Sequence, residues 1–128
     1  MIPTDLLYTD QHEWVKFADG VAAVGITHHA QNALGDITFV ELPEEGAELA
    51  KGAEACVIES AKAAASIYAP ADGTVTETNG ALEDDPAAVN ADPYGAGWIY
   101  KMSVPDASQL ADLLTPEQYD ALLAEEQD

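Results

Sequence analysis

The stretch that decides the fold reads Val57-Ile58-Glu59-Ser60-Ala61-Lys62-Ala63-Ala64-Ala65-Ser66-Ile67-Tyr68-Ala69-Pro70-Ala71-Asp72-Gly73. Its composition predicts two strands, the first ending near Glu59 and the second restarting near Ser66. Small residues lie between them, and Lys62 is the only long side chain of that segment. We therefore expect a β-hairpin that presents a single lysine at its tip.

Short strand-like segments continue on both sides of this hairpin. Proline- and glycine-containing turns such as 43–46 and 70–73 separate them. Strands are predicted at residues 12–17, 20–26, 36–41, 53–59, 66–68, 73–78 and 98–104. The pattern indicates a mainly β chain, and 128 residues suffice for one core, so we expect a single domain over residues 1–128.

Three helix-start signals interrupt or follow the strands. Thr27 can cap a short internal helix over 28–34, which Gly35 would close. Two segments, Asp106–Gln109 and Thr115–Gln118, have the spacing of capping boxes and precede leucine-rich stretches. We expect C-terminal helices that pack on the sheet through those leucines.

Charge is the most unusual bulk feature of the chain. Four lysines and no arginine stand against 24 acidic residues, a formal net charge of −20. Such a surface repels phosphate backbones and anionic lipids, so nucleic acid and membranes are not expected partners. We interpret the acidity as a means of solubility, as in a saline cytosol, in preference to attraction toward a basic partner.

The first residues lack the basic and apolar regions of a signal peptide and contain acidic residues that a transit segment would avoid, so neither is expected, and no apolar run approaches the length of a bilayer span. A cytoplasmic prokaryotic protein is expected, although a processed organelle protein would look the same.

The lone Cys56 is interpreted as a buried apolar residue. His28 and His29 are adjacent and make a poor chelate, and His12 could pair with Glu13. No metal site and no catalytic motif is predicted.

The segments Glu59–Ala64 and Ile67–Gly73 resemble the lipoylation site of glycine cleavage H proteins. Other segments resemble that family's pattern in the expected order: 12–15, 25–27, 33–36, 39–43 and 92–98. The likeness runs from about Tyr8 to the C-terminal helix. It implies a barrel-sandwich hybrid of two β-sheets, as in lipoyl and biotinyl carriers.

The resemblance also implies a role. The chain would be a non-catalytic carrier with lipoate attached covalently to Lys62, shuttling an aminomethyl intermediate. Its implied partners are the glycine decarboxylase (P protein), the aminomethyltransferase (T protein) and dihydrolipoamide dehydrogenase (L protein). A lipoyl ligase or transferase would modify Lys62 and read surroundings that include Glu59. A monomer is expected.

The chain departs from the family pattern after the lysine. A serine and an acidic residue are usual where Ala65 and Ser66 stand here, and Ala61 replaces a common valine. The family's acidic residue is thought to help hold the arm's amine, whereas Ser66 can only hydrogen-bond. Glu13 and Ser66 are therefore the candidate arm contacts. Glu13 could equally be an ordinary surface carboxylate of a strand.

Other interpretations of Lys62 remain open. Without the resemblance, a lysine among alanines is most simply a solvated loop residue. An H-like protein that relays lipoyl groups, or serves another lipoate-dependent pathway, is the alternative that the missing acid favours. A non-lipoylated interaction module is a further one. A biotin carrier is disfavoured because methionines normally flank its lysine, whereas Ala61 and Ala63 flank Lys62.

Overall fold

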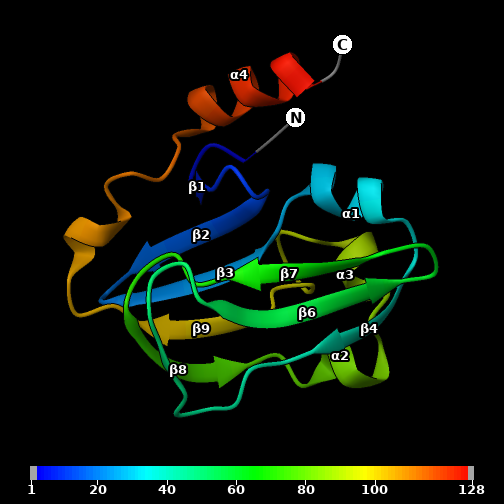
Figure 1. Ribbon diagram of the computed structural model, residues 1–128, viewed down its shortest axis with the longest axis horizontal. Coiled ribbons are helices and arrows are strands. Elements are labelled where there is room, and N and C mark those ends of the chain that lie inside the picture. The colour runs from blue at the N-terminus through cyan, green and yellow to red at the C-terminus, as the bar shows by residue number, and fades with distance from the viewer. Residues whose placement is uncertain (1–2, 127–128) are drawn as a thin grey trace.

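Two antiparallel β-sheets make up most of the computed structural model, which describes residues 3–126 (Figure 1). The six-stranded sheet has the order β1 (Leu7–Tyr8), β2 (Glu13–Ala18), β3 (Val21–Ile26), β9 (Tyr100–Ser103), β8 (Gly73–Thr78) and β5 (Glu48–Leu49). The three-stranded sheet has the order β4 (Ile37–Glu41), β6 (Glu54–Ser60) and β7 (Ala64–Tyr68). The predicted mainly β architecture is confirmed.

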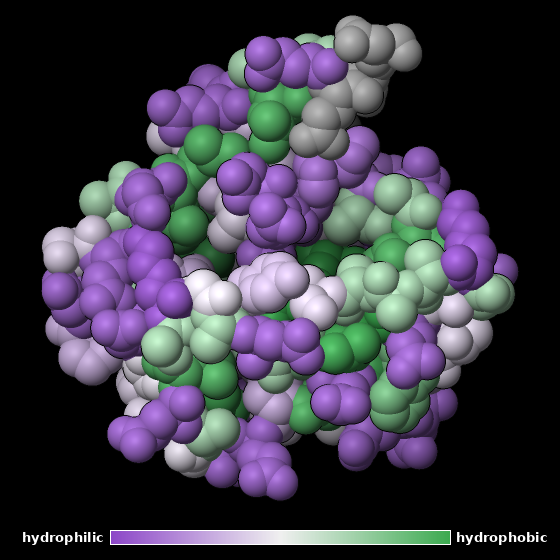
Figure 2. Space-filling view, in the orientation of Figure 1, coloured by the Kyte–Doolittle hydropathy of each residue, from purple (hydrophilic) through white to green (hydrophobic). Residues whose placement is uncertain are grey.

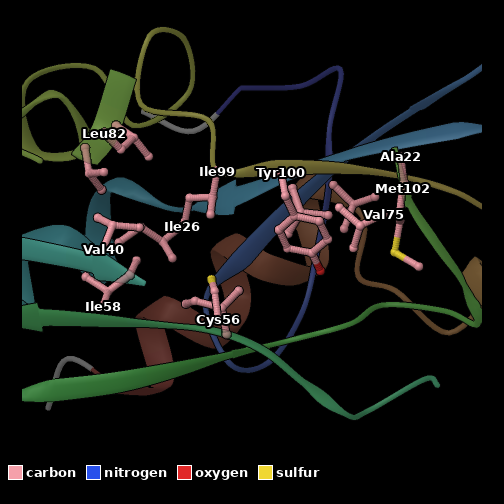
Figure 3. Packing of buried hydrophobic residues seen from close by; sticks show 14 of the residues in the cluster. Ala22, Ile26, Val40, Cys56, Ile58, Val75, Leu82, Ile99, Tyr100 and Met102 are labelled. Carbon is pink, nitrogen blue, oxygen red and sulfur yellow. The ribbon is translucent and has the colours of Figure 1, made fainter. Parts of the chain in front are cut away.

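The core lies between the inner faces of the two sheets. Figure 3 shows Val40 and Ile58 of the smaller sheet facing Ile26 and Ile99, and all four are buried. These apolar side chains leave water together, which is the main favourable term in holding the sheets face to face. Cys56 is 2% exposed in the same core, so the interpretation of a buried apolar cysteine is confirmed, and desolvation raises the pKa of its thiol.

The internal helix and the last helix begin as predicted. Helix α1 (His28–Leu34) is capped by Thr27, whose hydroxyl accepts a hydrogen bond from Ala30 N–H at 3.2 Å. Helix α4 (Pro116–Glu126) follows a reciprocal capping box. Thr115 Oγ1 accepts from Gln118 N–H at 3.2 Å, and Gln118 Oε1 accepts from Thr115 N–H at 2.9 Å.

The predicted capping box at Asp106 is wrong. Asp106 caps only a 3-10 turn, η1 (Ala107–Leu110), by accepting from Ser108 N–H at 3.1 Å. The Gln109 side chain does not fold back on the turn, because it forms two hydrogen bonds with Asp72 at 2.6 and 2.9 Å. Tertiary pairing has replaced the local cap, and no full helix forms there.

Four short elements were not predicted: β1, β5, α2 (Ala81–Asp84) and α3 (Ala88–Ala91). Each has two to four residues, too few for a period to be visible in the sequence. Leu82 and Val89 are fully buried and anchor the two helices to the core. None of the helices between residues 3 and 126 combines the length and the apolar character needed to cross a bilayer.

Candidate functional site

The predicted hairpin is formed by β6 and β7, which pair from Glu59 opposite Ala64 toward Tyr68. Its turn is closed by a hydrogen bond from Ser60 N–H to the Ala63 carbonyl at 2.8 Å. The Ser60 hydroxyl also accepts from Ala63 N–H at 3.1 Å. These bonds fix the turn backbone, and Lys62 is exposed at its tip.

The loop after α1 supports the base of the Lys62 side chain. The Asp36 carbonyl accepts from Ala61 N–H at 3.2 Å, which ties the turn to this loop. A Cβ built on Gly35 would lie 3.3 Å from Lys62 Cε and 4.0 Å from its Nζ. The lysine stem therefore lies in the space that glycine leaves. Within residues 3–126 the Lys62 side chain makes no hydrogen bond or ion pair that would hold the stem there.

The Lys62 environment fits a covalently extended lysine. Within residues 3–126 the ammonium makes no ion pair, so acylation would break no charge interaction. Exposed Ala61, Ala63 and Ala64 surround it and leave room for an approaching protein. Acylation would convert the hydrated ammonium into a neutral amide on a longer flexible stem.

Asn90, which the sequence analysis missed, holds the loop beneath Lys62. From α3, its Nδ2 donates to the Gly35 carbonyl and to Gln31 Oε1, both at 2.8 Å. Its Oδ1 accepts from Ile37 N–H at 2.9 Å. One amide thus satisfies backbone groups on both sides of Asp36. Only the fold brings these residues together, so no local signal could have found it.

Glu13 is 2% exposed, so the interpretation as a surface strand carboxylate is wrong. Its Oε1 accepts from the Thr9 hydroxyl at 2.9 Å, and its Oε2 accepts from Tyr68 N–H at 2.7 Å. Desolvation raises the pKa of the carboxyl, and the two hydrogen bonds only partly oppose that effect. Its role as an arm contact stays a prediction.

A cavity of about 490 Å³ opens beside Glu13, with Thr9, Gln11, Lys51 and Tyr68 among its lining residues. Lys51 lies at this cavity with its ammonium 2.7 Å from the Asp112 carboxylate. The cavity therefore lies along the end of β7, the strand that follows Lys62 in the hairpin.

An acidic side chain, that of Glu54, lies next to Ser66. The Ser66 hydroxyl donates to Glu54 Oε2 at 2.9 Å, so a carboxylate reaches this position from β6. Glu59 is exposed on β6 and pairs with Ala64 in the residue pair next to the turn. The proposed roles of Ser66 at the arm and of Glu59 in ligase recognition remain predictions.

The histidines make ordinary side-chain contacts. The Nδ1 atom of His12 shares a hydrogen bond with the Tyr119 hydroxyl at 2.8 Å. His28 bonds Gln31 at 2.9 Å, and the His29 ring lies 4.4 Å from that of His12. In the described part of the chain, no group of three or more His, Cys, Asp or Glu side chains is placed to hold a metal ion.

Comparison with known proteins agrees with this geometry. The family model described as glycine cleavage H-protein matches residues 6–126. The chain belongs to the glycine cleavage H-protein family. The H protein of Alcanivorax borkumensis is 50% identical over 125 residues, covering 98% of both chains. That of Escherichia coli O7:K1 is 50% identical over 126 residues, with the same coverage.

A solved structure supports the same family assignment. The crystal structure of a glycine cleavage system H protein from Mycobacterium marinum matches with a TM-score of 0.89 and 41% identity, over 96% of this chain and 99% of that chain. The predicted barrel-sandwich hybrid is thereby confirmed. As a glycine cleavage H protein, the chain is a carrier component of a multienzyme system and not itself a catalyst.

Proposed function

We propose that Lys62 carries a lipoyl group in amide linkage and that the chain is the lipoyl carrier of a glycine cleavage system. The observation that carries the proposal is an exposed lysine with no ion pair among the described residues, at the tip of a stiff hairpin in an H-family chain. Once attached, lipoate supplies reversible dithiol–disulfide chemistry.

The chain's own residues would present and orient this arm. Ser60 rigidifies the turn, Gly35 leaves space for the stem, and the flanking alanines allow an enzyme to close around Lys62. Glu13 and Ser66, the latter through Glu54, are the proposed polar contacts for a returning arm. A charged amine at the end of such an arm would be attracted to the carboxylates of Glu13 and Glu54.

The proposed partners follow from the same role. They are the glycine decarboxylase, the aminomethyltransferase and dihydrolipoamide dehydrogenase, together with a lipoyl ligase or transferase that contacts Glu59. The ligase or transferase would need access to the hairpin itself, and the small exposed side chains around Lys62 support such access. The bacterial relatives support a cytoplasmic location.

The proposal is tested by glycine–bicarbonate exchange with purified glycine decarboxylase from the same organism. Lipoylated wild-type chain is compared with the unmodified chain and with ligase-treated Lys62→Arg. Exchange should require the modified wild-type chain and be absent from the other two. If the lipoylated chain supports no exchange, the carrier role is wrong and a lipoyl relay is favoured instead.

A further inference from the structure

A β-bulge turns Phe39 out of the core. Strict alternation along β4 would place Ile37 and Phe39 on one face, but the register with β6 shifts between them. Ile37 stays 4% exposed whereas Phe39 is 49% exposed. Among residues 3–126, Phe39 is the one large hydrophobic residue that is exposed to solvent. Thr38 stabilises the bulge by donating from its hydroxyl to the Glu59 carbonyl at 3.3 Å.

Phe39 lies on the same outer face as the Lys62 hairpin. The pairing registers align Phe39 with Glu59 and Glu59 with Ala64, two residues beyond Lys62. Two residues further along β4, Glu41 pairs with Val57 and lies on the same face as Phe39. In Figure 1, β6 and β7 face the viewer with no helix in front of them, and Figure 2 shows hydrophobic and hydrophilic residues side by side over these strands.

The exposed part of the Phe39 ring is available to a partner protein. Burial of a phenylalanine side chain stabilises a fold, and at 49% exposed Phe39 forgoes about half of that burial. Aromatic side chains at the centre of an interface recover such energy when a partner covers them. The exposed carboxylates Glu41 and Glu59 flank this side chain, so a matching partner surface would carry lysine or arginine around an apolar socket.

The short reach of an unmodified lysine identifies that partner. Enzymes that act on a lipoyl arm meet its far end, away from the hairpin, but the enzyme that first acylates Lys62 must bring its active site to Nζ itself. We propose that Phe39 is the apolar anchor for this acyl-transferring enzyme, whose docking surface is an apolar socket edged with basic residues. This inference rests on the proposed acylation of Lys62.

The reaction served by this docking is a simple acyl transfer. Nζ, having lost a proton, attacks an activated lipoyl carboxyl such as an acyl-adenylate. The amide bond forms, and the activating group leaves with the electron pair of its bond to the acyl carbon. Phe39 does not touch the reacting atoms in this account. It positions the hairpin, so its loss should raise KM for the carrier and leave kcat nearly unchanged.

The test measures the rate of lipoylation by intact mass, with lipoate–protein ligase, lipoate and ATP. Phe39→Ala should lower kcat/KM by about tenfold through KM, as expected for an interface anchor, and Phe39→Leu should fall between it and the wild type. Glu41→Lys should also lower kcat/KM, most strongly at low salt. Asp120→Lys, which makes the same charge change on α4 away from the hairpin (Figure 1), is the matched control.

The outcomes separate this inference from the proposed function. Wild-type KM and kcat for Phe39→Ala would overturn the anchor while leaving Lys62 as the lipoylation site. A lowered kcat at unchanged KM would also overturn it, because Phe39 would then act on the chemical step. An unmodified wild-type chain would instead remove the proposed function and the inference together. Thermal unfolding of each variant checks that the fold is intact.

Discussion

The Glu13 carboxylate accepts the backbone N–H of Tyr68 at 2.7 Å, across 55 residues of sequence. This bond joins β2 of the six-stranded sheet to the free edge of the three-stranded sheet, because β7 is an edge strand. An edge strand leaves outward N–H groups without a ladder partner, and Glu13 satisfies one of them. Glu13 thus links the end of the Lys62-bearing hairpin to the six-stranded sheet.

Glu13→Ala should lower the free energy of unfolding by about 1–3 kcal/mol, because it leaves Tyr68 N–H without its acceptor and removes packed atoms. Urea unfolding followed by circular dichroism measures the change. Glu117→Ala, an exposed carboxylate on α4, should shift stability by less than about 0.5 kcal/mol. Equal effects of the two substitutions would contradict the role given to Glu13.

The buried Glu13 should also give stability a defined pH dependence. Desolvation raises its pKa above the ordinary 4.5, so the folded chain keeps this proton to a higher pH than the unfolded chain does. The stability linked to Glu13 is therefore complete below 4.5 and is lost as the pH rises through the raised pKa.

Glu13→Gln keeps a carbonyl acceptor but cannot ionise, so it lacks this dependence. Relative to Glu13→Gln, the wild type should lose stability as the pH rises from about 4 toward neutrality. Unfolding free energies at matched pH values give the comparison. A difference between the two chains that is constant with pH, or that changes in the opposite direction, would show that folding does not raise the pKa of Glu13.

Features set by adjacent residues could be predicted from the sequence. The hairpin around Lys62 follows from two strand-forming segments with small residues between them, and the cap at Thr27 and the box at Thr115 follow from their own spacing. Each of these depends on hydrogen bonds within a few residues, so the local pattern contains the required information.

Features that depend on distant partners could not be predicted. Asp106 has the spacing of a capping box, but Gln109 bonds Asp72 instead. Alternation in β4 would bury Phe39 with Ile37, and only the pairing with β6 shows the bulge. Glu13 lies on an ordinary strand pattern, yet its burial follows from the position of the other sheet.

Asn90→Ala should loosen the loop under Lys62, because three hydrogen bonds that join Gln31, Gly35 and Ile37 are lost. We expect a destabilisation of about 1–3 kcal/mol, since Ile37 N–H is left without an acceptor. Amide hydrogen exchange should quicken at Ile37 and at Ala61, which bonds the same loop.

Asn32→Ala is the matched control for this loop, since Asn32 is exposed on α1. It should leave exchange at Ile37 and Ala61 unchanged. If Asn90→Ala also leaves both amides as protected as in the wild type, the loop is held by other contacts and Asn90 has no positioning role.

Lipoylation of Lys62 is tested most directly by intact mass after incubation with lipoate–protein ligase, lipoate and ATP. The wild type should gain one lipoyl group. Lys51→Arg should gain one as well, because the ammonium of Lys51 is engaged 2.7 Å from the Asp112 carboxylate. Lys62→Arg should gain none. A lipoyl group that persists on Lys62→Arg, or a wild-type chain that stays unmodified, would contradict the account.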